Sequence, residues 1–70
     1  MEDFEVKKMS DTEKGFVADI SIDGNSICRV LVEDNDLKLR ESYIVSEKLC
    51  KKIISDPEVK DKILKLKKGD

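Results

Sequence analysis

Residues 15–33 constrain the fold of this chain more than any other stretch, because two alternating apolar patterns flank one cluster of turn-forming residues. In the first arm, every second residue is apolar: Phe16, Ala18, Ile20 and Ile22. In the second arm, the same period gives Cys28, Val30 and Val32. A period of two is typical of a strand with one buried face, and residues 23–26 between the arms favour a turn. The stretch is therefore predicted to form a β-hairpin.

The register of this hairpin depends on the length of its loop. A two-residue turn at Gly24 and Asn25 would set Ile20 opposite Arg29, which mixes apolar and charged groups on one face. A three-residue loop over residues 24–26 keeps the apolar residues of both arms together, because a slip of one residue turns a strand over. The pairs would then be Ile22 with Cys28, Ile20 with Val30, and Ala18 with Val32. We predict such a loop, with a left-handed residue and a bulge.

The opposite face of the hairpin is mixed rather than polar. Its predicted partner-binding residues are Val17, Ile27, Arg29 and Leu31. Scattered apolar side chains are common on ordinary protein surfaces, so a purely solvated face is one interpretation. A contact patch for another protein is the second, and packing against the tail of this chain is the third.

Shorter alternating segments lie on both sides of the hairpin. Phe4 and Val6 alternate with charged residues, which predicts a short edge strand before the hairpin. After the turn-forming residues 34–36, Leu37 and Leu39 alternate with basic residues. Residues 37–40 are therefore either a fourth strand or an extended segment that crosses beneath the helices.

Two helical patterns follow the strands. The first helix would be capped by Ser42 or Ser46 and end near Ser55. Its predicted apolar stripe consists of Leu49, Cys50 and Ile53.

The second helix has the clearest start signal in the chain. Ser55 and Glu58 have the spacing of a capping box, and Pro57 lies in the first turn. Its predicted apolar stripe consists of Val59, Ile63 and Leu66.

Strands followed by helices predict an α+β fold. We expect one small domain over residues 1–70, with the sheet over roughly residues 3–40 and the helices over roughly residues 44–68. The sheet would be a three- or four-stranded antiparallel meander, with both helices packed on one of its faces. So short a chain has a small core, which leaves little room for a large ligand pocket.

Acidic and basic residues divide between the two halves of the chain. Residues 1–36 hold ten acidic and four basic residues, and residues 37–70 hold six acidic and ten basic residues. The basic half can be a solvated surface or a surface for an anionic partner. For the second case, the expected contacts are Lys48, Lys51 and Lys52. The net charge of −2 gives no electrostatic reason to expect nucleic acid.

The chain lacks the residue groups that catalysis and metal binding use. It contains no histidine, and Cys28 and Cys50 alone do not form an ordinary zinc site. The two cysteines are expected to be buried thiols rather than a disulfide. The three glycines are scattered and form no phosphate-binding loop. We therefore predict no enzyme activity, no metal and no cofactor.

The start of the chain lacks the basic and apolar segments of a signal peptide, and no apolar stretch has the length of a membrane span. We expect a cytoplasmic protein that acts on no membrane and no small-molecule substrate.

The predicted function is that of a small protein-interaction or regulatory domain, similar to an inhibitor. It would contact another protein, or a second copy of itself as a homodimer. The alternative is a nucleic-acid-binding regulator that uses the lysine-rich helical half.

Overall fold

The computed structural model describes residues 4–67 and contains a four-stranded antiparallel sheet followed by two helices. The strands are β1 (Phe4–Asp11), β2 (Gly15–Ile22), β3 (Asn25–Glu33) and β4 (Asp36–Ser42), and the helices are α1 (Glu47–Ser55) and α2 (Pro57–Lys65). The strands lie side by side in sequence order, so the sheet is a meander. The α+β prediction is confirmed, and residues 37–40 belong to the fourth strand. The predicted limits at residues 3 and 68 lie outside the described residues.

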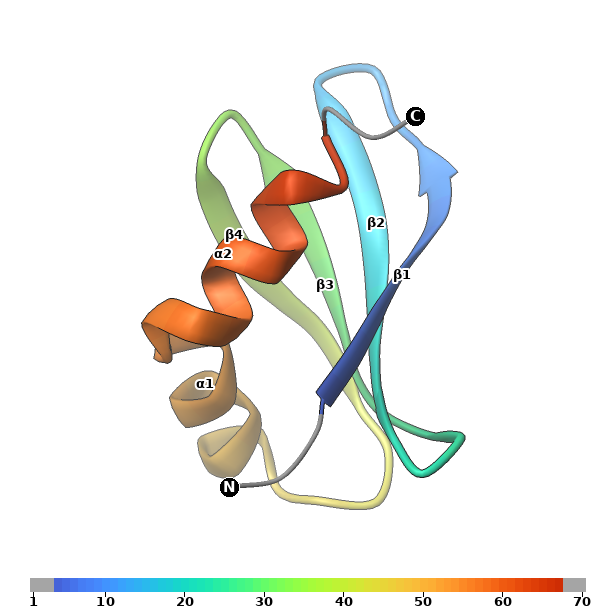
Figure 1. The fold of residues 1–70 in the computed structure, drawn as a ribbon, viewed down its shortest axis with the longest axis vertical. Coiled ribbons are helices and arrows are strands. Elements are labelled where there is room, and N and C mark those ends of the chain that lie inside the picture. Colours follow the sequence, from blue (N-terminus) through green and yellow to red (C-terminus); the bar gives the residue numbers. More distant parts are fainter. Residues whose placement is uncertain (1–3, 68–70) are drawn as a thin grey trace.

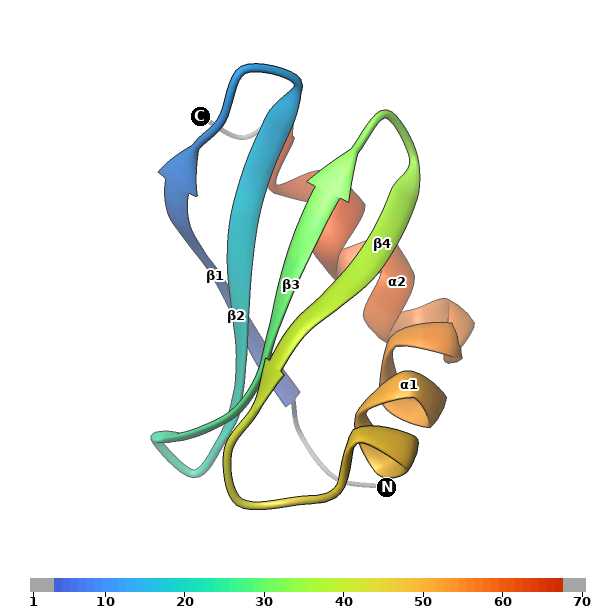
Figure 2. The same cartoon turned by 180° about the vertical axis from the view of Figure 1, so that it is seen from behind.

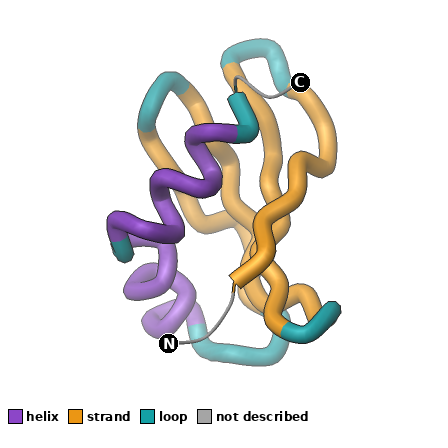
Figure 3. The backbone as a smooth tube through the Cα atoms, in the orientation of Figure 1, coloured by secondary structure: helices purple, strands orange, loops and turns teal. Residues whose placement is uncertain are grey.

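Both helices lie on the same face of the sheet (Figure 1). From behind, the four strands form an open face that neither helix covers (Figure 2). The backbone tube shows the same two layers, with the helical layer crossing the strands (Figure 3).

Two lysines, Lys62 in α2 and Lys67 after it, donate hydrogen bonds that connect the helical layer to the sheet. Lys62 donates to the carbonyl oxygen of Phe4 at 3.0 Å, and Lys67 donates to that of Asp34 at 3.3 Å.

The β2–β3 connection differs from the predicted three-residue loop. Ile22 pairs with Asn25, so the loop has two residues, Asp23 and Gly24. Their φ angles are 52° and 81°, as in the type I′ turn that best matches the twist of a hairpin. The predicted pairs are therefore wrong. The observed pairs are Ile20 with Cys28, Ala18 with Val30, and Phe16 with Val32.

A bulge at Ile27 explains why the apolar faces still coincide. The register shifts between Ile20 and Ser21, which leaves Ile27 without an opposite residue on β2. The extra residue restores the alternation that a two-residue loop would otherwise have disrupted. Ile27 and Cys28 are consecutive, yet both are buried in the core. The prediction that Ile27 lies on the opposite, exposed face of the hairpin is wrong.

The core lies between the sheet and the helices. Its buried apolar residues are Phe16, Ala18, Ile20, Ile27, Cys28, Val30, Val32, Cys50, Ile54, Val59 and Ile63. Both cysteines are buried free thiols, as predicted. Burial raises the pKa of the Cys28 thiol to about 12, and its neighbour Cys50 acts in the same direction.

The residues that cap the two helices agree with the predicted caps only in part. Ser46 caps α1, because its side chain accepts a hydrogen bond from the N–H of Leu49 at 3.2 Å. Asp56 caps α2 by accepting from the N–H of Glu58. The predicted capping box of Ser55 is absent, since the Ser55 hydroxyl donates to the carbonyl of Lys51 within α1.

The buried stripe of α1 also differs from the prediction. Cys50 and Ile54, which lie four residues apart, are buried, while Ile53 is half-buried. Leu49 is 43 % exposed, so it does not belong to the buried stripe. In α2 the prediction is closer, because Val59 and Ile63 are buried and Leu66 packs against the core.

Candidate functional site

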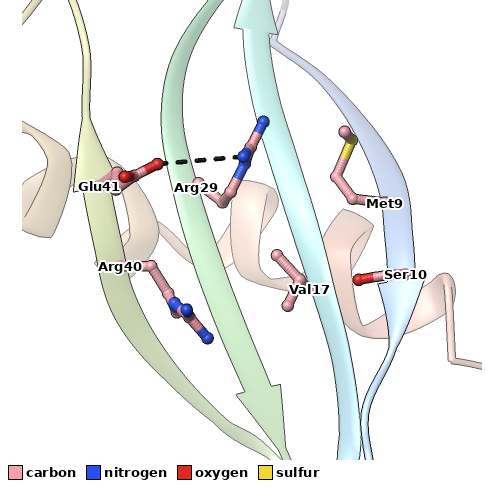
Figure 4. A pocket seen from close by; sticks show the side chains of 6 residues that line it. All are labelled: Met9, Ser10, Val17, Arg29, Arg40 and Glu41. Carbon is pink, nitrogen blue, oxygen red and sulfur yellow. Dashed lines mark ion pairs between the residues drawn. The ribbon is translucent and has the colours of Figure 1, made fainter.

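The open face of the sheet carries a hollow of about 520 Å³. Six residues from all four strands line it: Met9, Ser10, Val17, Arg29, Arg40 and Glu41. Figure 4 shows their side chains on the side of the sheet that faces away from the helices. The hollow is a feature of the sheet alone.

Two bulges in the edge strands widen this lining. In β1 the bulged residue is Met9, which has no opposite residue on β2. In β4 the bulged residue is Arg40, which has no opposite residue on β3. A bulge brings two consecutive side chains toward one face and bends the strand. Each edge strand therefore supplies two neighbouring residues to the hollow, Met9 with Ser10 and Arg40 with Glu41.

Arg29 occupies the middle of this face, where ion pairs hold it. Its Nε lies 3.5 Å from Oδ1 of Asp19, and one of its terminal nitrogens lies 3.9 Å from Glu41. Asp19 is only 8 % exposed, although it lies on the open face. The hydroxyl of Ser26 donates to its second carboxylate oxygen at 2.6 Å. The Asp19 carboxylate is thus a largely buried ion-pair partner of the Arg29 guanidinium.

Tyr43 contacts both Arg29 and Glu41 of this network. Its ring lies 5.6 Å from the guanidinium carbon of Arg29, within the range of a cation–π contact. Its hydroxyl donates to the carboxylate of Glu41, and this hydrogen bond raises the pKa of Tyr43. We name the residues Met9, Val17, Arg29, Arg40, Glu41 and Tyr43 the Arg29 patch.

The structure brings together two of the four predicted partner-binding residues. Val17 and Arg29 line the same hollow. Leu31 is half-buried and lies opposite Val17 on β2, but it does not line the hollow. Ile27 is 4 % exposed and belongs to the core. Sequence reasoning missed Met9 and Arg40, whose places in the hollow depend on the two bulges.

The three lysines predicted to contact an anionic partner are exposed but do not form one surface. Lys48 and Lys52 flank the exposed side chain of Leu49 in a small hollow on α1. Lys51 lines a different groove, which runs between β4 and the two helices. The basic charge of the helical half is therefore divided between separate sides of the helical layer.

Within residues 4–67, no group of three or more histidine, cysteine, aspartate or glutamate side chains has the arrangement of a metal site. Neither described helix has the length and apolar character that a membrane crossing requires. The chemistry of the open face is that of an ion-paired guanidinium, a second arginine and exposed apolar side chains.

Comparison of the chain with models of protein families, with curated proteins and with solved structures gave no match.

Proposed function

We propose that this protein is a small non-catalytic interaction domain that binds another protein, or a second copy of itself, through the Arg29 patch. The observation that carries this proposal is the hollow on the helix-free face of the sheet, where Met9, Val17 and Arg29 meet. Such a domain regulates or inhibits its partner by covering part of the partner's surface.

The composition of the patch supports this proposal. Methionine, tyrosine and arginine are enriched at the centres of protein interfaces, and the patch contains Met9, Tyr43 and two arginines. Met9 and Tyr43 are each 46 % exposed, which is high for large apolar side chains. A partner that covers them would remove this apolar surface from water.

The fixed geometry of Arg29 supports the same conclusion. Asp19, Glu41 and Tyr43 already hold its guanidinium. Ordering a long side chain on binding costs about 0.5–1.5 kcal/mol. A guanidinium that is ordered before the encounter avoids most of that cost. Arg40 is exposed and has no ion pair among the described residues, so it is available to a carboxylate of the partner.

The free thiols of Cys28 and Cys50 agree with a cytoplasmic location, since reducing compartments keep cysteines unpaired. We include this location in the proposal.

The test compares two exposed apolar residues on opposite sides of the molecule. Met9→Glu changes the patch, and Leu49→Glu changes α1 at a residue of similar exposure. Light scattering over a range of concentrations measures the oligomeric mass, and affinity capture from cells measures retained partners. We expect Met9→Glu to lose the dimer or the partner while Leu49→Glu keeps it. If both variants retain the mass and partners of the wild type, the proposal is wrong.

Nucleic-acid binding by the helical lysines is the second candidate, supported by the exposed lysines on both helices. Their division between two hollows makes it the weaker proposal, because a phosphate backbone needs a continuous basic track. A mobility-shift titration at increasing salt concentration separates the two. Binding that weakens steeply with salt would favour nucleic acid, and we expect no shift.

A further inference from the structure

A second groove lies between the free edge of β4 and the helices. It has a volume of about 480 Å³ and is lined by Leu37, Leu39, Lys51, Ile54, Ser55 and Lys60. This volume is within the range of about 300–1,000 Å³ that is typical of ligand pockets. Its floor is apolar, and its rim carries two ammonium groups. None of its residues belongs to the Arg29 patch.

One edge of β4 pairs with no other strand among residues 4–67, because β4 is the last strand of the sheet. The β3–β4 loop has two residues, so the closing pair Glu33 and Asp36 is hydrogen-bonded. In an antiparallel pair, hydrogen-bonded and non-hydrogen-bonded residues alternate. The N–H and C=O groups of Leu37 and Leu39 therefore point away from β3, toward the free edge.

The side chains of these two leucines point toward the helices. Leu37 lies opposite Val32, and Leu39 lies opposite Val30, both of which belong to the buried core. Both leucines are half-buried, and among residues 4–67 no strand lies beyond β4. The edge thus combines unused backbone groups with two partly uncovered apolar side chains.

The positive charge of the lysines beside β4 favours an acidic partner. Lys51 and Lys60 are exposed, and neither side chain has an ion-pair partner among residues 4–67. Lys38 lies on the other face of the same strand, 3.7 Å from Glu33. β4 itself carries two acidic and two basic residues, so a second copy of this edge would bring little of the negative charge that Lys51 and Lys60 favour. The carboxylates of an acidic strand would meet Lys51 and Lys60 on the side of the helices.

We propose that the β4 edge binds an extended acidic segment of a partner protein as a fifth strand. Backbone groups of the segment pair with those of Leu37 and Leu39, as in other complexes formed by strand addition. Its apolar side chains, at every second position, enter the groove against Ile54, and its carboxylates meet Lys51 and Lys60. This site goes beyond the Arg29 patch and stands independently of it.

The test uses a short synthetic peptide that alternates glutamate with leucine and valine, added to the full chain labelled with ¹⁵N. We expect chemical-shift changes over residues 36–40 and at α1 and α2 positions along the groove, with slower amide exchange of Leu37 and Leu39. Lys51→Glu combined with Lys60→Glu should weaken binding by at least about ten-fold, a loss that fluorescence anisotropy measures readily.

Three controls make the result decisive. Lys48→Glu combined with Lys52→Glu reverses two lysines of α1 outside the groove, so it should leave the affinity close to that of the wild type. A peptide methylated at the backbone nitrogens that face β4 should not bind, because it lacks the strand hydrogen bonds. The same peptide with lysine in place of glutamate should not bind either.

Three results would overturn the proposal. The first is an absence of shift changes at millimolar peptide, and the second is equal binding of the methylated peptide. The third is tighter binding of a single-stranded oligonucleotide to Lys51 and Lys60, which would assign the groove to nucleic acid. Because Met9→Glu leaves the groove intact, failure of this site and failure of the Arg29 patch are distinguishable.

Discussion

The guanidinium of Arg29 lies 5.6 Å from the centre of the Tyr43 ring and joins the middle of the sheet to the segment that leads into α1. The backbone N–H of Tyr43 also donates to the carbonyl of Ile27 at 3.0 Å. Two different contacts therefore hold this segment against β3.

Arg29→Ala should destabilise the fold, because it leaves the carboxylate of Asp19 buried without its ion-pair partner. We expect a loss of about 1–3 kcal/mol in the free energy of unfolding, measured by urea denaturation. Arg40→Ala is the matched control, since Arg40 is exposed and has no ion pair in the described part of the chain. Equal losses in the two variants would contradict the role given to Asp19.

Tyr43 should titrate above its ordinary pKa of about 10, because its hydroxyl donates a hydrogen bond to Glu41. The folded state then holds this proton more tightly than the unfolded state. The resulting stabilisation is fully present below the unfolded pKa and is lost as the pH rises through the folded pKa. Tyr43 is the only tyrosine and the chain has no tryptophan, so tyrosinate absorbance reports it alone.

Glu41→Gln provides the control for this titration. The variant keeps an acceptor but removes the negative charge, so the pKa of Tyr43 should fall toward its ordinary value. A native midpoint that matches the midpoint in denaturant would show that the hydrogen bond is not formed in solution.

The native protein should resist alkylation of its thiols near neutral pH. Cys28 and Cys50 are fully buried, and burial raises the pKa of Cys28 to about 12, so little reactive thiolate is present. Mass spectrometry after iodoacetamide treatment should find no label on the folded chain and two labels in denaturant. Rapid labelling of the native chain would mean that α1 opens away from β3.

The two glycines of the hairpin should respond differently to alanine. Gly24 has a φ of 81° and open space around it, so Gly24→Ala should cost about 1 kcal/mol from the backbone alone. A Cβ atom at Gly15 would lie 1.8 Å from the carbonyl oxygen of Val32. Gly15→Ala should therefore cost more, about 3 kcal/mol, because the strands have to separate. Thermal unfolding of both variants tests this order.

Local patterns were enough to predict the order of the elements, because hydrophobic periodicity and helix caps depend on near neighbours in the sequence. The first three strands, the end of α1 near Ser55 and the burial of Val59 and Ile63 follow from such patterns, whereas residues 37–40 fitted either a fourth strand or an extended crossing segment. The exposure of Leu49 does not, since α1 packs through Cys50 and Ile54. Which side of a short helix faces the sheet depends on its partners.

A bulge in the β2–β3 hairpin was predicted together with a three-residue loop, and the structure has a bulge with a two-residue loop instead. The dipeptide of Asp23 and Gly24 is a strong signal for a two-residue turn. Combined with the apolar pattern, this turn requires one extra residue in an arm, and that residue is Ile27. Nothing in the local sequence marks the bulges at Met9 and Arg40, so the hollow itself could not be predicted. Val17 and Arg29 were found because they lie on regular parts of β2 and β3.

The meander order of the strands has a consequence for the kinetics of folding. Each strand pairs with its neighbour in the chain, and the connections are residues 12–14, 23–24 and 34–35. Closing such short loops costs little chain entropy, and proteins dominated by contacts near in sequence fold quickly. The sheet can therefore assemble hairpin by hairpin, before the two helices that follow it in the chain pack on one of its faces.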